Sequence, residues 1–288
     1  MLSGAALRYC DDRGVLATMH GKEKVIAPLI ERFLGLRIEA ASGLSTDRFG
    51  TFSRDVERTG SQLDAARAKI RAAYDTVPGS QIGLSSEGSF GPHPLIPYLT
   101  LEREIVMLID RTAGLELIGH YATPNTNFSH AMVEDADAAN AFAQRVGFPD
   151  HGIIVAGCRD GLPAPDIALI KDIATTEDLT SAIDCVISLC SVAFVETDMR
   201  AHRNPKRMRA IKRATIDLIR RFRSLCPQCG WPGFAVTERI AGLPCAWCDQ
   251  PTQLARAEVM SCGGCGWRDE RAVAATKSAP DYCDFCNP

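Results

Sequence analysis

The chain has 288 residues, of which 46% are hydrophobic and 23% are charged. This is the composition of a folded globular protein with a substantial core, so disorder is not the expected state. The formal net charge of -3 gives no reason to expect that the chain as a whole binds nucleic acid or an anionic membrane. The length predicts two domains, which we place at residues 1–224 and 225–288.

The first residues include Asp11 and Asp12 and no long apolar run behind a basic start, so we expect no signal peptide. No stretch approaches the roughly 18 uninterrupted apolar residues that a membrane helix needs. The richest stretch, Ile183 to Val195, is interrupted by Asp184 and is expected to be a core element. We therefore expect a cytoplasmic protein without a membrane partner.

The first predicted elements are a strand and a helix. The apolar run Gly14–Thr18 predicts a buried strand, and apolar residues from Val25 to Leu34 recur at helical spacing. The loop between them carries His20 and Lys22 at the start of the helix, where backbone N–H groups and a lysine could receive a phosphate. The alternative is an exposed capping turn.

A second helix is predicted from about Asp55 to Tyr74, and its Lys69 faces either a site or water. The apolar strand that begins at Ile82 then enters a glycine-rich segment, which we expect to be a loop. Open α/β folds place their sites in loops at strand ends. This loop contains one carboxylate and one histidine. Glu87 is the candidate metal-binding carboxylate. His93 either belongs to the same site or only orders the turn.

The segments 104–110 and 115–121 predict a hairpin, and residues 135–146 predict a helix that leads to an apolar strand ending near Val155. The segment that begins at Glu196 is expected to open a long helix with one apolar and one basic face. A solvated surface is the usual fate of such a basic face, but acidic residues and His202 at the helix start favour an anion site. The basic residues are Arg200, Arg203, Lys206, Arg207, Arg209, Lys212 and Arg213.

Eight of the 12 cysteines form four Cys-x-x-Cys pairs in the last part of the chain. This spacing lets a tight turn direct two thiolates at one ion, so we predict two structural Zn²⁺ ions in a double zinc ribbon. Residues 234–240 and 253–260 are expected to be its strands. Four protein thiolates per ion leave no open position for a substrate, so the module is expected to be structural or adhesive. The predicted ligands are Cys226, Cys229, Cys245, Cys248, Cys262, Cys265, Cys283 and Cys286.

Three alternatives stay open for these cysteines. They could form disulfides, or their thiolates could hold an iron–sulfur cluster. The pairing is also open: successive Cys-x-x-Cys pairs could share an ion, which we favour, or the first and third pairs could join against the second and fourth in a cross-brace.

The order of motifs from about Val15 to Arg223 resembles the inosine triphosphate pyrophosphatase family, which hydrolyses non-canonical purine nucleotides. The matching segments are Ala17-Thr-Met-His-Gly-Lys22, Thr51-Phe52, Ala65-Ala-Arg-Ala-Lys69, Ser86-Glu-Gly88, Phe148-Pro-Asp-His-Gly152 and Ala201-His-Arg203. The family's loop asparagine is replaced by His20, its paired aspartates are reduced to Glu87, and Pro205 and the insert 156–195 are unlike it. The strings Glu-Gly-Ser-Phe-Gly-Pro-His at 87–93 and Thr-Asp-Met-Arg-Ala-His-x-Asn-Pro at 197–205, with the terminal zinc module, further resemble a bacterial family of unknown function over the whole chain.

The first resemblance implies a mixed-sheet α/β pyrophosphatase-like domain ahead of the zinc module. It implies that Glu87 holds a catalytic Mg²⁺, aided by Asp47 or Glu57, on a phosphorylated small-molecule substrate. Lys22 and Lys69 complete the implied catalytic set. The implied substrate-binding residues are His20, Arg200, His202 and Arg203.

The alternative function is a binding protein in which the basic helix and the zinc ribbon form a nucleic-acid or partner surface. The zinc segment itself is not basic, since it contains Asp249, Glu258, Asp269, Glu270 and Asp284. Nucleic acid is therefore the less favoured partner. The substrate base and the oligomeric state are left open by the sequence.

Overall fold

The computed structural model describes all residues except 1–8, 10–11 and 46–59. The chain divides into two compact units, one formed by Tyr9–Leu218 and one that contains Ile219–Pro288. Among the described residues, no helix is long and apolar enough to cross a membrane.

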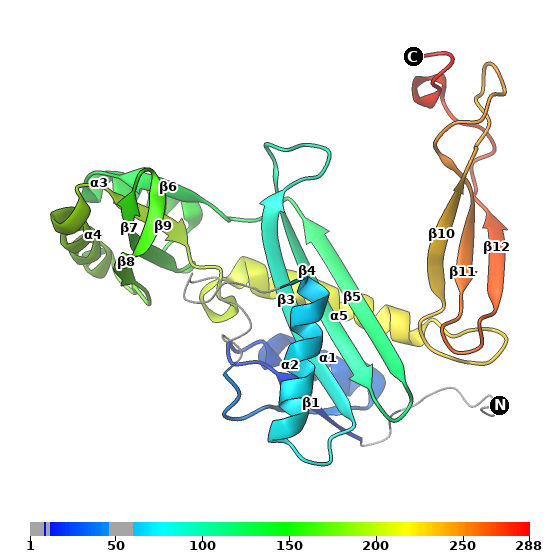
Figure 1. The fold of residues 1–288 in the computed structure, drawn as a ribbon, viewed down its shortest axis with the longest axis horizontal. Helices are drawn as coiled ribbons and strands as arrows, with labels where there is room; N and C mark the ends of the chain where they lie inside the picture. Colours follow the sequence, from blue (N-terminus) through cyan, green and yellow to red (C-terminus); the bar gives the residue numbers. More distant parts are fainter. Residues whose placement is uncertain (1–8, 10–11, 46–59) are drawn as a thin grey trace. The chain divides into compact units, whose positions relative to one another are not determined.

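The first unit is built on a five-stranded mixed sheet with the order β2-β1-β3-β4-β5 (Figure 1). The first three strands are parallel and the last two are antiparallel to their neighbours. This arrangement gives the mixed α/β architecture that the sequence predicts. The strands are β1 (Arg13–Ala17), β2 (Arg37–Ala40), β3 (Ile82–Pro92), β4 (Thr100–Asp110) and β5 (Leu115–Thr123).

Two helices connect the parallel strands. The helix α1 (Glu23–Leu34) buries Ile26, Ile30 and Leu34, and it ends at Gly35, whose φ of 72° closes the helix. The helix α2 (Gln62–Thr76) begins with a capping box between Ser61 and Asp64. The expected start of this helix near Asp55, together with the Thr51-Phe52 motif, lies outside the described residues.

The helices α2 and α5 (Pro205–Arg223) lie on opposite faces of the sheet. A Cβ added to Gly83 of β3 would meet Ile70 and Tyr74 of α2. A Cβ added to Gly119 of β5 would meet the backbone of α5 at Ala214 and Leu218, consistent with α5 crossing behind the long strands in Figure 1. Both helices therefore pack directly on the backbone of the sheet.

The predicted glycine-rich loop after Ile82 is wrong, because this segment is part of β3. The strand pairs with β4 over eleven positions, from Ile82 opposite Asp110 to Pro92 opposite Thr100. Gly88 does not serve a turn there. A Cβ at this position would collide with side chains of the neighbouring elements, so glycine permits their close approach. The predicted hairpin of β4 and β5 is confirmed, although β4 begins at Thr100.

A second, four-stranded sheet with the order β6-β9-β7-β8 completes the first unit. The predicted helix 135–146 is confirmed as α3, which is capped by Asp135. The segment Ile183 to Val195 supplies core residues, as predicted, but it is divided between α4 and β9. The elements are β6 (His130–Val133), α3 (Ala136–Val146), β7 (Ile153–Arg159), β8 (Leu162–Ile170), α4 (Thr176–Cys190) and β9 (Ala193–Thr197).

The basic helix is present but starts later than expected. Glu196 lies in β9, a short 3-10 turn covers Ala201–Arg203, and the side chain of Asn204 accepts a hydrogen bond from the N–H of Arg207 at the start of α5. Pro205 therefore occupies the first helical position, where its missing N–H has no cost.

The second unit contains an antiparallel sheet of β10 (Ala235–Ala241), β11 (Ala255–Ser261) and β12 (Arg268–Ala272). The two predicted zinc-module strands are confirmed as β10 and β11. The third strand was not predicted, because the sequence Arg-Asp-Glu-Arg-Ala has no alternation of apolar and polar residues.

Candidate functional site

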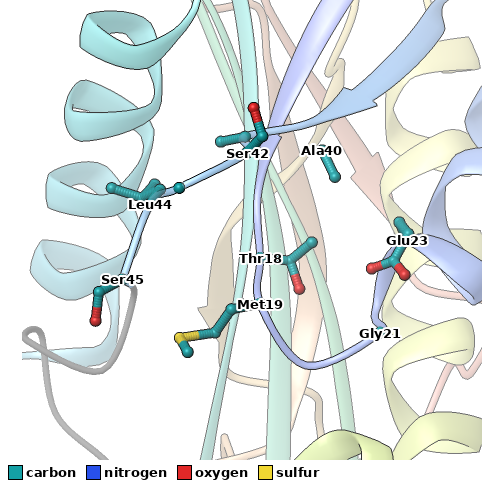
Figure 2. A pocket seen from close by; sticks show the side chains of 10 residues that line it. Thr18, Met19, Gly21, Glu23, Ala40, Ser42, Leu44 and Ser45 are labelled. Carbon is teal, nitrogen blue, oxygen red and sulfur yellow. The ribbon is translucent and has the colours of Figure 1, made fainter.

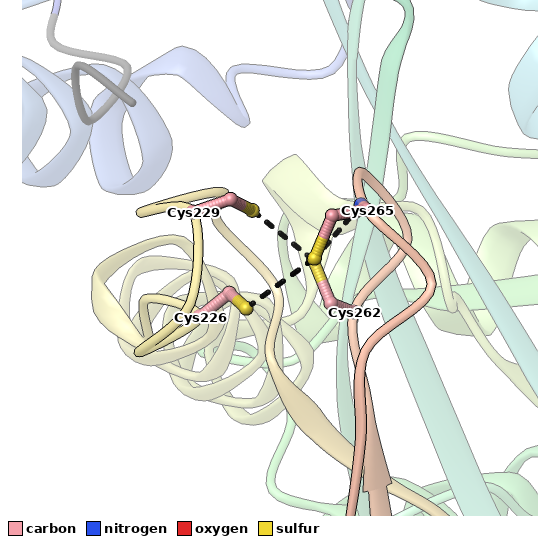
Figure 3. Close-up of side chains that lie close together, drawn as sticks. All are labelled: Cys226, Cys229, Cys262 and Cys265. Carbon is pink, nitrogen blue, oxygen red and sulfur yellow. Dashed lines mark hydrogen bonds between the residues drawn. The ribbon is translucent and has the colours of Figure 1, made fainter. Parts of the chain in front are cut away.

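The eight predicted ligands of the second unit form two tetrads of cysteines. One contains Cys226, Cys229, Cys262 and Cys265, whose sulfurs face one another in Figure 3, and the other contains Cys245, Cys248, Cys283 and Cys286. The sulfur–sulfur distances between loops are 3.8 and 3.6 Å in the first tetrad and 3.9 and 3.6 Å in the second. Four sulfurs at about 2.3 Å from one tetrahedral ion lie about 3.8 Å apart. Each tetrad therefore could hold one zinc ion.

The favoured pairing of successive Cys-x-x-Cys pairs is wrong. The first pair joins the third and the second joins the fourth, which is the cross-brace arrangement. The cysteines of the tetrads are free, and their sulfurs are far beyond the roughly 2.0 Å of a disulfide bond. Within a tetrad all four lie within 4.8 Å of one another, which suits a single ion rather than a cluster of several iron atoms.

Backbone hydrogen bonds shape each cysteine loop. The N–H of Gly230 donates to the carbonyl of Cys226, and the N–H of Gly266 donates in the same way to Cys262. Both glycines have φ near 75°, which their missing Cβ permits. In the second tetrad the N–H groups of Cys248 and Trp247 lower the pKa of Cys245 to about 7, so the thiolate form that binds metal is favoured.

The aromatic residues beside the two tetrads have different surroundings. Trp231 and Trp267 pack around the first tetrad, and Trp267 stacks on Phe234 with ring centres 5.2 Å apart. Three aromatic residues beside the second tetrad are exposed: Trp247 by 76%, Tyr282 by 61% and Phe285 by 68%. We call these three residues the aromatic patch.

In the first unit, a group of charged side chains is buried around the middle of β3. Glu87 points toward α2, where its carboxylate lies 2.5 Å from the Nζ of Lys69. Both residues are less than a tenth exposed. Burial of an ion pair is costly unless each charge is compensated, and here each residue supplies the opposite charge for the other.

A second buried ion pair lies on the other face of β3. Arg207 of α5 donates to the carboxylate of Glu104 at 2.7 Å and also to the carbonyl of Met199. A Cβ at Gly88 would collide with both partners of the pair. The neighbouring carboxyl group of Glu102 has its pKa raised to about 7 by burial and by Glu104.

Lys22 lies at the edge of β3 between these two pairs. The strand β1 ends at Ala17, opposite Ser85, while β3 continues beyond this point. The backbone carbonyl of Ser86 therefore has no partner in β1, and the Nζ of Lys22 donates to it at 2.9 Å. Burial, followed by the nearby charges of Arg207 and Lys69, lowers the pKa of Lys22 from 10.5 to about 7. We call Lys22, Lys69, Glu87, Glu104 and Arg207 the charged cluster.

An open cavity of about 520 Å³ adjoins the loop that carries Lys22. Figure 2 shows its lining side chains, which come from the loop after β1, the first turn of α1 and the segment after β2. Thr18 lines this cavity, and its hydroxyl oxygen is buried without a hydrogen-bond partner in the described part of the chain. The cavity lies at the carboxyl ends of β1 and β2, where open α/β sheets place ligand sites.

The predicted substrate-binding residues divide into two groups. His20 and His202 stack on each other with ring centres 5.0 Å apart, so the turn before α5 reaches the Lys22 loop. Burial, followed by Arg200, lowers the pKa of His202. Arg200 instead binds Asp198 and Asp172, at 2.6 and 2.7 Å.

Arg203 also binds elsewhere, because its guanidinium donates to the carbonyl of Ile173. The structure thus brings Lys22, Lys69 and Glu87 together, and separately His20 and His202. The contacts described for Arg200 and Arg203 do not include any of these three cluster residues.

Sequence reasoning missed Glu104 and the special role of Arg207. Glu104 was expected only as the start of a strand, and Arg207 only as one of seven basic residues. The available signal was the pair Glu102 and Glu104, two carboxylates on the same face of a strand that continues as the apolar run 105–109. Buried carboxylates in such a position need a basic partner.

No curated protein matches this sequence. A family described as Domain of unknown function (DUF6671) matches residues 69–288, which include Lys69, Glu87 and both cysteine tetrads. The match covers more than half of the chain. The chain therefore belongs to the DUF6671 family.

Proposed function

We propose that the first unit binds a nucleoside triphosphate, or a similar phosphorylated small molecule, and hydrolyses it with a divalent metal ion. One observation carries the proposal: Lys22, Lys69 and Glu87 come from three separate elements and meet at one buried point of the sheet. The open cavity is lined by Gly21 and Glu23, the residues on either side of Lys22, and we propose that a ligand enters there.

The lysines would bind phosphate oxygens. Lys22 is held at the start of α1, where the helix dipole also favours an anion. Its lowered pKa reflects burial beside Arg207 and Lys69, and an anionic ligand would favour its protonated form. A phosphate would also compete with Glu87 for Lys69.

Glu87 is the carboxylate that would hold the metal ion. Magnesium is commonly bound by one or two protein carboxylates together with substrate phosphates and water, so one buried glutamate fits this ion. A bound Mg²⁺ would supply Lewis-acid stabilisation of the phosphates and an activated water. The additional carboxylates considered from the sequence, Asp47 and Glu57, lie outside the described residues.

The stacked His20 and His202 are the better candidates for contact with a base. Arg200 and Arg203 would first have to leave Asp198, Asp172 and the carbonyl of Ile173. The similarity of the segments around Lys22, Glu87 and His202 to inosine triphosphate pyrophosphatases supports a nucleotide as the substrate.

The test is release of pyrophosphate from a panel of canonical and deaminated nucleoside triphosphates, with and without Mg²⁺. The Glu87→Gln variant should lower kcat/KM by at least about 100-fold. Glu177→Gln, which changes an exposed glutamate of α4 in the same way, should leave it unchanged. No turnover of any nucleotide by the zinc-loaded wild-type protein would reject the hydrolase proposal.

The aromatic patch favours a second function for the other unit, binding of a protein partner. Large exposed aromatic side chains that lie near one another mark interaction sites. Their surroundings are acidic, since Asp281 and Asp284 are exposed, and a zinc ion with four thiolates carries a net negative charge. Asp249 is already paired with Lys277 at 2.6 Å. A basic polypeptide, whose cations can also stack on aromatic rings, fits this surface better than nucleic acid.

Titration with a lysine- and arginine-rich peptide, followed by tryptophan fluorescence, tests this second function. Replacement of Tyr282 and Phe285 by alanine should abolish peptide binding, whereas Val236→Ala, at an exposed position of β10, should not. Binding of RNA with steep salt dependence, and none of the peptide, would instead support a nucleic-acid function.

A further inference from the structure

A second pocket in the first unit lies between α5 and the end of β5. It has a volume of about 200 Å³ and is lined by Tyr121, Thr123, Asn125, Lys206, Arg209, Ala210 and Arg213. We call it the basic pocket. It contains none of the residues of the charged cluster.

Helical spacing explains why three cations line this pocket. Lys206, Arg209 and Arg213 are three, four and seven residues apart, so their side chains project from the same side of α5. Buried Ala210 lies between them and leaves space that a larger side chain would fill. Arg207, in contrast, turns to the sheet and is committed to Glu104.

The pocket is rich in hydrogen-bond donors and has no carboxylate in its lining. Within the described ranges, none of its three cations forms an ion pair, although the Nζ of Lys206 donates to Asn125 at 3.3 Å. Tyr121 and Thr123 add two hydroxyl groups from one face of β5. Three cations that line one pocket, with no carboxylate among the lining residues, suit a site for a multiply charged oxyanion.

We propose that the basic pocket is a binding site for a small phosphorylated anion, such as pyrophosphate or the terminal diphosphate of a larger ligand. Its volume supports a small ligand, because pockets that enclose drug-sized molecules typically measure about 300–1,000 Å³. The site is separate from the proposed nucleotide site and does not depend on the hydrolase activity. Arginine at two of the three positions suits bidentate contacts to phosphate oxygens.

The test is calorimetric titration of the full-length, zinc-loaded protein with inorganic pyrophosphate and with inorganic phosphate. Pyrophosphate should bind more tightly, since it carries more charge. Arg209→Gln and Arg213→Gln should each weaken its binding about tenfold or more. Lys212→Gln is the matched control, because it removes the same charge from an exposed position of α5 that does not line the pocket.

Two further titrations separate this site from its alternatives. Loss of pyrophosphate binding in Lys22→Met, together with unchanged binding in Arg209→Gln and Arg213→Gln, would place the anion at the charged cluster and overturn the inference. Equal weakening by Lys212→Gln, or tighter binding of single-stranded RNA than of pyrophosphate, would show a general polyanion surface and would also overturn it.

Discussion

Replacement of Lys22 by methionine should change how the stability of the first unit depends on pH. The pKa of Lys22 is lowered to about 7 in the folded protein, from an ordinary value of 10.5. Between these values the unfolded chain holds a proton on this lysine that the folded chain has lost, so stability rises with pH across this window. Below pH 7 the buried charge opposes folding by on the order of 5 kcal/mol.

The substitution removes this penalty but also removes the hydrogen bond to the carbonyl of Ser86, which costs about 1–3 kcal/mol. At pH 6 we therefore expect the variant to be more stable than the wild type by a few kcal/mol. At pH 10 the order should reverse, because the wild-type lysine is then largely neutral and keeps its hydrogen bond. The total swing is on the order of 4 kcal/mol.

Urea unfolding followed by far-UV circular dichroism at several pH values measures this difference. The signal comes mainly from the helices of the first unit. All three tryptophans, at positions 231, 247 and 267, lie in the second unit, so their fluorescence serves as an internal control that should not change. Parallel stability profiles for the variant and the wild type would refute a buried lysine with a lowered pKa.

Three further outcomes are expected. Gly88→Ala should break the ion pair of Glu104 and Arg207 and lower the free energy of unfolding in urea by about 3–5 kcal/mol. Gly91→Ala, where an added Cβ has open space around it, should lower it by about 1 kcal/mol or less. Equal effects of the two substitutions would contradict the close packing at Gly88. Gly119→Ala should force α5 away from β5 and destabilise the first unit by at least about 1–3 kcal/mol, and an unchanged unfolding midpoint would argue against this contact. Cys283→Ser should reduce the zinc content from two ions to one by elemental analysis, while the exposed Cys185→Ser should retain both; two ions in both variants would remove Cys283 from the ligand set.

The local patterns of the sequence predicted much of the fold. The helix 135–146, the β4–β5 hairpin and the first two strands of the zinc module follow from periodicity and turn residues within short windows. The glycine-rich part of β3 was misjudged, because glycine serves a turn in some contexts and close packing in others. At Gly88 the deciding factors are the side chain of Glu104 in β4 and that of Arg207 in α5, which is more than a hundred residues away in sequence.

The metal ligands could be predicted from the sequence, but which Cys-x-x-Cys pairs share an ion could not. Both possible pairings leave connections long enough to form a tetrahedral site, so spacing alone does not choose between them. The ion pair of Glu104 and Arg207 could not be predicted for a similar reason. The two residues are 103 positions apart in the sequence and meet only when α5 packs on the sheet. Such long-range contacts leave no periodic signal in the sequence.

The cross-brace has a consequence for the order of events during protein synthesis. Each site connects cysteines as far as 39 or 41 residues apart, and the two connections overlap along the chain. When the first four thiols have emerged from the ribosome, their proper partners are still missing, yet they can already capture an ion among themselves. An ion captured in this way would have to be exchanged before the mature arrangement could form. Assembly of the cross-brace is therefore favoured by metal that stays exchangeable until Cys262 and Cys265 have also emerged.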